Sequence, residues 1–481
     1  MTIFKILPAL LALALPLLLA AGSAGAAAPA MTDRSCHLPG VVEALRCVSV
    51  TVPLDHAQPQ GQTLALHVTV APAFRQGSRT DPLFVLAGGP GQAGSDVLVL
   101  LKAAFDRVRA TRDIVFIDQR GTGRSGKLGC ASKPEHETMG DAELMAELRA
   151  CIAANKSPLS AYTTLAAARD LERVRLALGY GQVNLWGGSY GTRLAQTYAR
   201  AYPSSVRALV LDGVAAPDQV IPAGGRDSQT ALDGVFAACA RDAACHKAYP
   251  NLRAEFDGLV TRLEAGDLRL SLPNPRTAEQ TSFTMSSDRF LGTVHNILYA
   301  PADARRLPFL IHNASRGRWQ PFIARQNLAG DFGNDASVSM LLHFAVVCAE
   351  DVPRFTPELM KADAAVLARP LAEMMPKLCR DDIKVPAVPY PEPTRIDAPA
   401  LLLSGALDPV TPPHRAASAA RSMAHAQQIV VANAGHGVSQ LGCAPRLLRA
   451  FLDHPRDKLD AACMAEIPAP TFQLGSAGPQ P

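Results

Sequence analysis

A short glycine-rich segment holds the residue best suited to nucleophilic chemistry. Residues 187–191 read Gly-Gly-Ser-Tyr-Gly, a G-x-S-x-G pattern centred on Ser189. The apolar run 183–186 precedes this segment, and residues 192–201 that follow it are good helix formers. A strand that enters a helix through so sharp a turn needs glycines beside the turn and holds its serine exposed above the sheet. We therefore predict that Ser189 is a nucleophile.

A serine hydroxyl needs a base that takes its proton and an acid that orients the base. When the serine lies on such a turn, the acid and then the histidine follow along the chain, each just past the end of a strand. Asp408 follows the candidate strand 398–403, and His436 follows the next one, 428–432. Asp212, at the end of the strand after the serine, is the alternative acid. We favour Asp408 because its strand comes one unit before the histidine loop.

Attack on a carbonyl group also needs backbone N–H donors for the oxyanion that forms. The amide of Tyr190, directly after the candidate nucleophile, is one such donor. Residues 88–91, Gly-Gly-Pro-Gly, follow the candidate strand 82–86, and glycines there let the main chain approach a substrate. An isolated segment of this kind would be an ordinary turn. Its place at a strand end leads us to expect the second donor here.

The elements around these residues alternate between strand and helix. The candidates are strands at 47–52, 63–71, 82–86, 113–117, 183–186 and 206–211 and helices at 97–109 and 164–178. The first two strands are expected to be antiparallel. The rest of this order predicts an α/β fold with a mostly parallel, doubly wound sheet that has helices on both faces.

The alternation stops at about Pro217. Up to about Pro389 the pattern is helical, apart from a polar hairpin-like stretch at 268–283; the candidate helices are 230–241, 252–264, 287–298, 337–350 and 357–367. We predict a helical cap at 217–388, inserted between core segments at 29–216 and 389–468. The Pro-, Gly- and Ser-rich residues 469–481 are expected to form a loose tail.

The first 28 residues have the features of a secretory signal peptide. Lys5 precedes an apolar run at 6–21, and small residues follow it. The alternative is a membrane anchor, but the run is short and contains Pro8 and Pro16. No later segment is long and apolar enough to span a bilayer. We expect export to the periplasm or the exterior, with no stable membrane insertion after cleavage.

Ten cysteines in an exported chain favour disulfide bonds. The sequence does not fix their connectivity, and buried free thiols are the alternative. Pairing neighbours in order gives Cys36 with Cys47, Cys130 with Cys151, Cys239 with Cys245, Cys348 with Cys379 and Cys443 with Cys463.

Composition and motifs argue against several other classes of protein. The formal charge is only +4, from 47 basic and 43 acidic residues, so nucleic acid is not an expected partner. No C-x-x-C or H-E-x-x-H motif suggests a metal site. Residues 121–126 match G-x-G-x-x-G after a strand, but they open no predicted helix, so we expect no dinucleotide. We predict no cofactor.

Taken together, these motifs resemble the prolyl and tripeptidyl aminopeptidase family of α/β-hydrolase serine peptidases. The resemblance is closest to secreted bacterial members with a tripeptidyl-aminopeptidase-like C-terminal region. It rests on residues 88–91, Asp-Gln-Arg-Gly-Thr-Gly-Arg-Ser at 118–125, 170–175, 187–191, 408–412 and 435–437, in the family's order. One departure is Ala87, where prolyl aminopeptidases usually carry histidine, which speaks against strict proline specificity.

The resemblance implies an α/β-hydrolase fold with Ser189, Asp408 and His436 as catalytic triad and Gly89 and Tyr190 as oxyanion donors. It also implies that the chain releases amino-terminal residues or short peptides, while the cap holds the amino end of the substrate.

A free ammonium group is best recognised by carboxylates. Glu350 and Asp351, at the end of a predicted cap helix, are the candidates; the alternative is that both are solvated surface acids. Two other functions stay open. One is a carboxylesterase acting on short acyl esters, and the other is a noncatalytic binding protein on the same scaffold.

Overall fold

The computed structural model of the chain describes Met1 and residues 31–75, 80–331, 338–389 and 393–478. Within these residues the main sheet has nine strands in the order β1-β2-β3-β5-β4-β6-β7-β10-β11. The strands are β1 (Met31–Cys36), β2 (Leu45–Pro53), β3 (Thr63–Ala71), β4 (Leu83–Leu86), β5 (Ile114–Ile117), β6 (Val183–Gly188), β7 (Val206–Asp212), β10 (Ala400–Gly405) and β11 (Ala426–Val431). From β1 to β5 neighbours are antiparallel, and from β5 to β11 they are parallel. The predicted mostly parallel sheet is confirmed.

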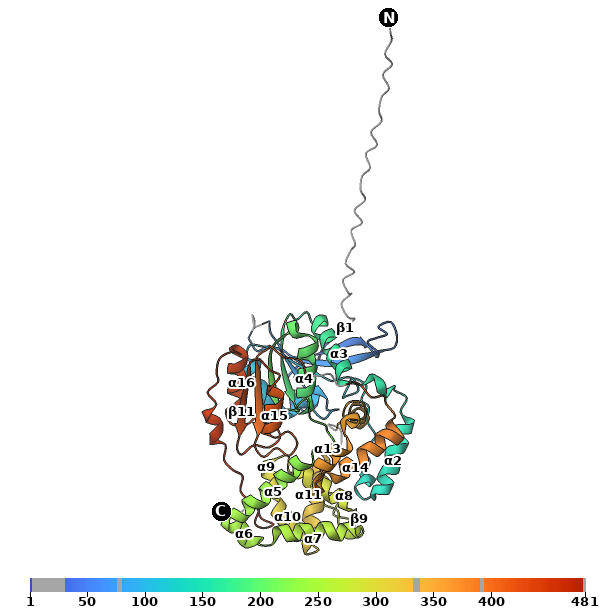
Figure 1. Cartoon of the computed structure of the whole chain (residues 1–481), viewed down its shortest axis with the longest axis vertical. Coiled ribbons are helices and arrows are strands. Elements are labelled where there is room, and N and C mark those ends of the chain that lie inside the picture. Colours follow the sequence, from blue (N-terminus) through green and yellow to red (C-terminus); the bar gives the residue numbers. More distant parts are fainter. Residues whose placement is uncertain (2–30, 76–79, 332–337, 390–392, 479–481) are drawn as a thin grey trace.

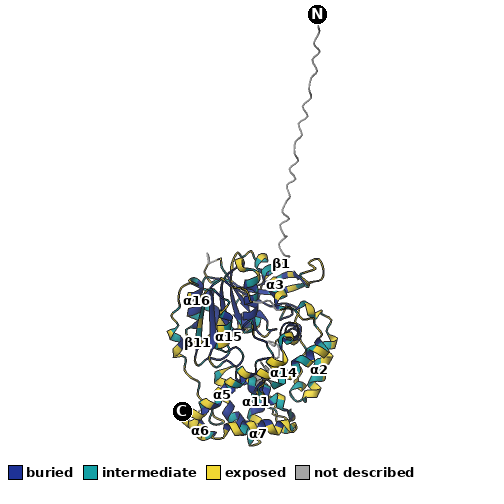
Figure 2. Ribbon diagram, in the orientation of Figure 1, coloured by how far each residue is buried: buried dark blue, intermediate teal, exposed yellow. Residues whose placement is uncertain are grey.

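Helices cover both faces of this sheet, because successive side chains of its buried strands point to opposite faces. In β6, Leu185 packs into one core and Trp186 into the other. The first core lies under α3 (Thr164–Ala177), α4 (Tyr190–Ala201) and α15 (Pro413–Ala420), and the second under α1 (Gly94–Arg109) and α16 (Ala444–Asp453). Figure 2 shows the strands as the most deeply buried elements.

The chain between β7 and β10 forms a helical layer that lies below the sheet in Figure 1. Its helices are α5 (Gly225–Arg241), α6 (Ala243–Ala248), α7 (Leu252–Glu264), α8 (Ser287–Ile297), α9 (Pro301–Ala304), α10 (Leu307–Ser315), α11 (Gln320–Asp331), α12 (Met340–Val346), α13 (Pro357–Ala362) and α14 (Arg369–Leu378). The expected hairpin is present as β8 (Leu268–Pro273) and β9 (Gln280–Met285). An aromatic core that includes Phe290, Trp319 and Phe322 holds this layer together.

Despite the length of the insertion, β7 and β10 are neighbours in the sheet, with Ala400 opposite Leu209 and Leu403 opposite Asp212. The helical layer therefore leaves and re-enters the sheet at adjacent strands. Because the two strands are parallel, the chain leaves the sheet at the carboxyl end of β7, beside the G-x-S-x-G turn that follows β6, and returns at the amino end of β10.

Several segments differ from the sequence-based expectation, including one helix that is shorter than predicted and one that was not predicted. The helix expected over 337–350 is α12, which ends at Val346 and continues as a wider π-helical turn over Val347–Asp351; residue 337 lies outside the described residues. The helix α2 (Asp141–Ala154) was not predicted. None of its residues is buried, and a helix without a buried face has only a weak apolar periodicity by which to predict it.

The expectation of a loose tail is wrong for residues 472–474, which dock onto the helical layer. Phe472 is 6% exposed and packs into the core of the helical layer, under the guanidinium of Arg305. The main chain of Gln473 bonds to Arg305 and to the hydroxyl of Tyr249. One aromatic side chain is enough to dock a segment that Pro and Gly would otherwise leave loose. The last described residues accordingly lie near α6 in Figure 1.

All five cysteine pairs predicted by order are disulfides in the structure. They join Cys36 to Cys47, Cys130 to Cys151, Cys239 to Cys245, Cys348 to Cys379 and Cys443 to Cys463. The signal peptide expected at 1–28 lies, apart from Met1, outside the described residues. Among the helices that are described, none combines the length and the apolar character that a membrane span requires.

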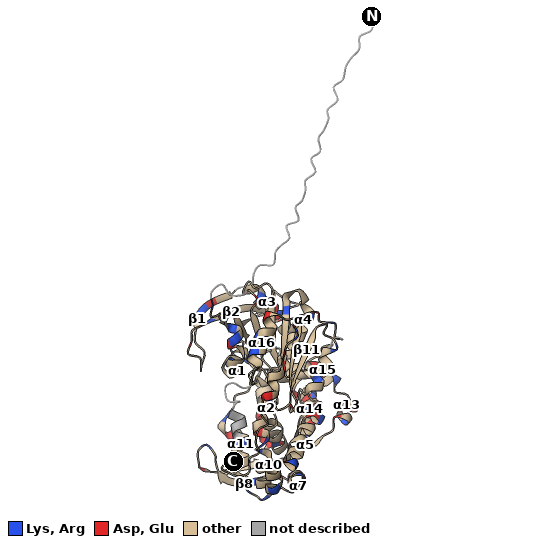
Figure 3. Ribbon diagram, turned by 90° about the vertical axis from the view of Figure 1, so that its left-hand side faces the viewer, with Lys and Arg blue, Asp and Glu red and all other residues tan. Residues whose placement is uncertain are grey.

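Basic and acidic residues are interspersed along the elements seen in Figure 3. Three arginines are nearly fully buried instead: Arg112, Arg120 and Arg193. Each is paired with at least one aspartate that is distant in sequence. Burying such charges is tolerated only where partners and hydrogen bonds compensate them, so these pairs mark positions where distant segments are fixed together.

Candidate active site

Ser189 occupies the tight turn that the sequence predicted between β6 and α4. Its backbone has φ 54° and ψ −124°, in the left-handed half of backbone space, which a non-glycine residue occupies only under strain. A Cβ atom at Gly187 would collide with the carbonyl oxygen of Gly191, and one at Gly191 with that of Leu86. Only glycine fits at these two positions, so the motif is a requirement of the turn.

Hydrogen bonds hold this turn in place. The amide of Ser189 donates to the carbonyl oxygen of Asp212 at 2.9 Å. The carbonyl oxygen of Ser189 accepts from the hydroxyl and the amide of Thr192, at 2.6 and 2.9 Å. The serine is therefore fixed to the neighbouring strand β7 and to the first turn of α4, and its side chain lines a cavity.

Asp408 and His436, from the ends of β10 and β11, are in direct contact. Nδ1 of His436 lies 2.8 Å from Oδ2 of Asp408. The hydroxyl of Thr411 donates to the same carboxylate oxygen at 2.7 Å, and the amides of Val410 and Thr411 donate to Oδ1 at 2.9 Å each. The carboxylate is therefore held rigidly against the imidazole ring.

This contact shifts both pKa values. Burial alone would raise the pKa of Asp408, but the charge of His436 and the bonds from His436 and Thr411 outweigh it, so this pKa lies below its usual range. Burial would likewise lower the pKa of His436, yet the Asp408 carboxylate raises it above its ordinary value. The pair can therefore stabilise a proton on the imidazole.

Asp212, the alternative acid, makes different contacts. Its carboxylate accepts hydrogen bonds from the amides of Val438 and Ser439, between 2.8 and 3.0 Å. These amides belong to the loop just after His436. Asp212 thus binds the main chain of the histidine loop, whereas the imidazole of His436 forms its hydrogen bond with Asp408.

The Gly-Gly-Pro-Gly turn, residues 88–91, lies against the nucleophile turn. A Cβ atom at Gly88 would be 3.0 Å from Cβ of Ser189, so the two turns nearly touch. Gly89, Tyr190 and Ser189 line the same cavity. The two candidate oxyanion donors are therefore brought together with the candidate nucleophile.

The Asp-Gln-Arg stretch at 118–120 supports this turn, a role that its motif did not reveal. The buried carboxylate of Asp118 accepts from the amides of Ser95 and Arg124, at 2.8 and 2.9 Å. The side chain of Gln119 donates to the carbonyl oxygen of Ala87 at 2.9 Å. These bonds fix the chain on both sides of residues 88–91.

Arg120 completes this support by joining the sheet to helix α3. Its guanidinium pairs with both carboxylate oxygens of Asp170 at 2.7 Å, and it donates to the carbonyl oxygens of Pro53, Leu54 and Ala161. A bidentate pair of this kind demands arginine, because only its planar fork matches a carboxylate. The contacts of residues 118–120 therefore support the surrounding structure.

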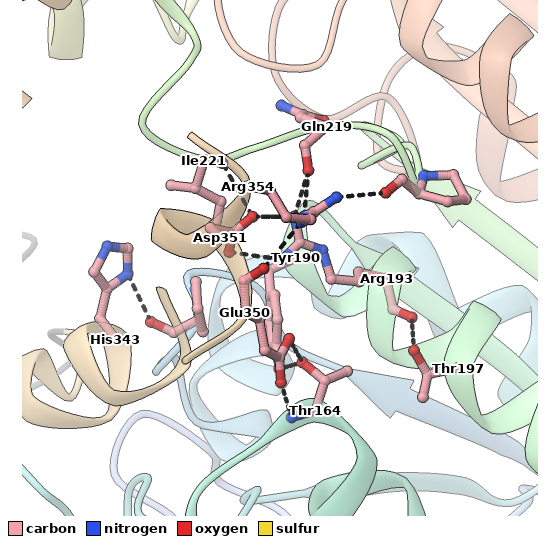
Figure 4. A network of polar contacts seen from close by, with 12 residues as sticks. Thr164, Tyr190, Arg193, Thr197, Gln219, Ile221, His343, Glu350, Asp351 and Arg354 are labelled. Carbon is pink, nitrogen blue, oxygen red and sulfur yellow. Dashed lines mark hydrogen bonds and ion pairs between the residues drawn. The ribbon is translucent and has the colours of Figure 1, made fainter. Parts of the chain in front are cut away.

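Glu350 and Asp351 are both buried, so the alternative that they are solvated surface acids is wrong. Glu350 accepts from the amide and the hydroxyl of Thr164 at 2.6 and 2.7 Å, and the same hydroxyl lies 2.7 Å from that of Tyr190. Burial raises the pKa of Glu350. Figure 4 shows this acid at one end of a polar network.

Asp351 lies at the centre of the same network. It forms a bidentate pair with Arg193, at 2.9 and 3.0 Å, and a third bond with Arg354 at 3.0 Å. It also accepts from the amide of Ile221 at 3.2 Å. Two guanidinium groups therefore surround this one carboxylate. Neither Asp351 nor Glu350 is among the described residues that line the cavity beside Ser189.

That cavity has a volume of about 300 Å³ and lies between the sheet and the helical layer. Its apolar wall includes Ala215, Ile221, Pro222, Leu367, Pro370 and Leu371. Its polar wall includes Gln219, Ser228, His295, Asn296, Tyr299 and His343, none of which was predicted from the sequence. Three larger hollows, of about 780, 550 and 490 Å³, have none of the candidate catalytic residues among the described residues that line them.

The helical layer also contacts the histidine loop directly. The amide of His436 donates to the carbonyl oxygen of Tyr299 at 2.9 Å, and the two rings meet edge to face with centroids 5.0 Å apart. No signal in the sequence indicated this contact, because Tyr299 follows α8 without any motif. The position of the imidazole therefore depends on the helical layer as well as on Asp408.

Comparison with known proteins agrees with this geometry. A family model described as the alpha/beta hydrolase fold matches residues 81–439. Serine protease Hip1 of Mycobacterium tuberculosis is 30% identical over 280 residues, 53% of each chain. Tripeptidyl aminopeptidase of Streptomyces lividans is 30% identical over 247 residues, 46% of each chain. A probable proline iminopeptidase of Streptomyces coelicolor is 37% identical over 134 residues, 28% of this chain and 33% of that protein. The chain thus spans about half the length, or less, of these relatives.

Proposed function

The chain belongs to the alpha/beta hydrolase fold family, and we propose that within it the protein is an exported serine exopeptidase. In this proposal it releases amino-terminal residues or short peptides by way of an acyl-enzyme. The contact between Asp408 and His436, beside a cavity lined by Ser189, is the observation that carries the proposal. The names of the relatives, two of them aminopeptidases or iminopeptidases, support peptides as the substrate class.

The proposed reaction begins at Ser189. The Nδ1–H of His436 donates to Asp408, so the lone pair of Nε2 is the one that accepts the serine proton as Oγ attacks the substrate carbonyl carbon. The amides of Gly89 and Tyr190 then stabilise the oxyanion of the tetrahedral intermediate. The imidazolium returns the proton to the leaving amine, and water releases the acyl group through the same steps in reverse order.

The tight turn at Ser189 supports this role through its strain. A serine held at φ 54° persists only because its neighbours over-determine it, and such strain concentrates at functional sites. Five disulfides support export, since disulfides persist in oxidising compartments. The role of Glu350 and Asp351 in binding the substrate's amino group stays a prediction.

One comparison tests the proposal. Wild type and Ser189→Ala are assayed on alanyl, alanyl-alanyl and trialanyl 4-nitroanilides and on 4-nitrophenyl butyrate. We expect the wild type to cleave at least one anilide and Ser189→Ala to lose at least about 10⁴-fold in kcat. Turnover of the ester alone would indicate a carboxylesterase. Activity that survives Ser189→Ala would contradict the assignment of the nucleophile.

A further inference from the structure

The Gly-Gly-Pro-Gly turn contains a chain of hydrogen-bonded peptide groups that begins in the helical layer. The amide of Ser339, directly before α12, donates to the carbonyl oxygen of Gly91 at 2.8 Å. The peptide group that contains this carbonyl ends in the N–H of Gln92, which donates to the carbonyl oxygen of Gly88 at 3.1 Å. The peptide group of Gly88 ends in turn in the N–H of Gly89, the predicted oxyanion donor.

The N–H at the end of this chain has no acceptor within the described part of the protein. Gly89 is exposed and lines the cavity beside Ser189. In a trans peptide group the C=O and the N–H point in opposite directions. The hydrogen bond that Gln92 donates to Gly88 therefore sets the direction in which the N–H of Gly89 points. The orientation of the predicted donor thus depends on the peptide groups that precede it in the chain of hydrogen bonds.

A side chain of α12 holds the same turn at a second point. Nδ1 of His343 lies 3.3 Å from the carbonyl oxygen of Pro90, which can only accept, so Nδ1 carries the proton (Figure 4). The main chains also pack closely, because a Cβ atom at Gly91 would lie 2.8 Å from the carbonyl oxygen of Ser339. Only glycine fits there. Two successive carbonyl oxygens of the turn therefore accept their hydrogen bonds from the helical layer.

Helix α12 is itself attached to the nucleophile side of the cavity. The amide of Leu341 donates to the carbonyl oxygen of Leu128 at 3.1 Å. The side chain of Leu341 shares a buried core with Tyr190, whose amide is the other predicted oxyanion donor. At the end of the π-helical turn that continues α12, Asp351 forms its bidentate pair with Arg193 of α4. The segment that supports the turn is therefore connected to the helix that follows the nucleophile.

This support acts on a group that must be in place before the reaction begins. Each peptide group in a chain of hydrogen bonds polarises the next, so the bond from Ser339 strengthens the donor at the other end. A donor that is already oriented needs no reorganisation when the oxyanion forms. On the premise of the proposed exopeptidase, in which Gly89 is an oxyanion donor, we propose that Ser339 and His343 are positioning residues of the oxyanion hole. The helical layer thereby contributes to the rate of the chemical step.

The first test removes the N–H with which this chain of hydrogen bonds begins. Lactic acid is placed at position 339 by nonsense suppression in an oxidising cell-free system, so that an ester replaces the amide. Ser339→Ala is the matched reference, because it has the same side chain and keeps the amide. On the best alanine-based 4-nitroanilide, we expect the lactate variant to lose about tenfold to hundredfold in kcat relative to Ser339→Ala, with KM within about threefold. On 4-nitrophenyl butyrate, kcat/KM should fall by a similar factor.

His343 gives an independent test through two substitutions of similar shape. His343→Asn keeps an N–H donor at the position of Nδ1, whereas His343→Leu has no donor there. Burial lowers the pKa of His343, so the imidazole is neutral at pH 7, as the amide of asparagine is. We expect His343→Leu to lose about fivefold to thirtyfold in kcat at unchanged KM, and His343→Asn to regain most of this loss. Melting temperatures of all variants show which of them are folded.

The remaining outcomes separate this inference from the proposed function. A folded lactate variant with the kcat of Ser339→Ala, or with a change in KM alone, overturns the inference and leaves the exopeptidase intact. Activity regained by His343→Gln, whose N–H lies at the position of Nε2, and not by His343→Asn would make His343 a substrate contact and also overturn it. Turnover of the butyrate alone overturns the exopeptidase, and the butyrate kinetics then decide the inference. A wild type without any turnover that depends on Ser189 overturns both.

Discussion

The two sides of the cavity use buried carboxylates in different ways. On the sheet side, Asp408 contacts His436, a group that can gain and lose a proton. On the side of the helical layer, Asp351 contacts Arg193 and Arg354, whose guanidinium groups stay protonated at all relevant pH values. The first arrangement is suited to moving a proton, and the second to holding a fixed shape.

This difference separates the residues proposed to act on the reacting bond from those proposed to position the substrate. The sheet side is assembled by two adjacent parallel strands, so its members are near each other in sequence. The helical side joins residues far apart in the chain, such as Arg193 and Asp351, through packing. A charge removed on the first side should therefore change rate, and one removed on the second should change stability.

The largest expected effect is that of Asp408→Asn. The amide removes the charge that stabilises the imidazolium, and its N–H can donate to Nδ1 and favour the wrong tautomer, so kcat should fall about 10⁴-fold on a free-amine anilide. Asp212→Asn disturbs only the main chain of the histidine loop and should cost at most about 10²-fold. Steady-state kinetics of the two variants side by side measure this. A larger loss in Asp212→Asn would make Asp212 the acid and reverse the assignment.

Next in size is a loss of stability in Asp351→Asn. Removing the charge leaves the buried guanidinium of Arg193 and the partly exposed one of Arg354 without their common partner, which should lower the free energy of unfolding by about 3–5 kcal/mol. Glu350→Gln, at the neighbouring position, replaces an acid whose carboxyl group is hydrogen-bonded to the neutral Thr164 and should cost about 1 kcal/mol. Urea unfolding followed by circular dichroism compares them. Similar losses in both would show that the arginine pairs do not fix this side of the cavity.

The smallest expected effect concerns pH. His436 acts as a base only when neutral, and Asp408 raises its pKa above the ordinary value of about 6.5. Activity should therefore be lost as the pH falls through a pKa higher than 6.5. Asp212 contributes the least to this shift, so Asp212→Asn should move the acid limb of kcat/KM slightly to lower pH. An acid limb at or below pH 6 in the wild type would contradict the contact between His436 and Asp408.

Much of the sheet side could be predicted because its signals are local. The glycines of the G-x-S-x-G segment are required by the turn itself, and Asp408 and His436 follow apolar strands whose parallel order brings their ends together. The pairing of cysteines by order was correct for a similar reason, since each disulfide closes a short stretch of chain. The catalytic roles of these residues stay predictions.

The helical side could not be predicted because its contacts are set by tertiary packing. Gln219 belongs to no motif, and its contacts depend on Val410, Arg193 and Arg354 being brought to it. Glu350 and Asp351 were singled out as candidates for binding an amino group, which stays a prediction, and only the structure shows that they are buried. Phe472 was missed because a single aromatic residue in a Pro- and Gly-rich segment carries no periodic pattern.

The central claim is that Ser189 is the nucleophile activated by His436 and Asp408. Its most direct test is labelling with a fluorophosphonate, which reacts only with an activated serine, followed by peptide mass spectrometry. We expect one adduct, on Ser189, formed rapidly in the wild type, much more slowly in Asp408→Asn and not at all in Ser189→Ala. A stable adduct on another serine, or none in the folded wild type, would contradict the claim.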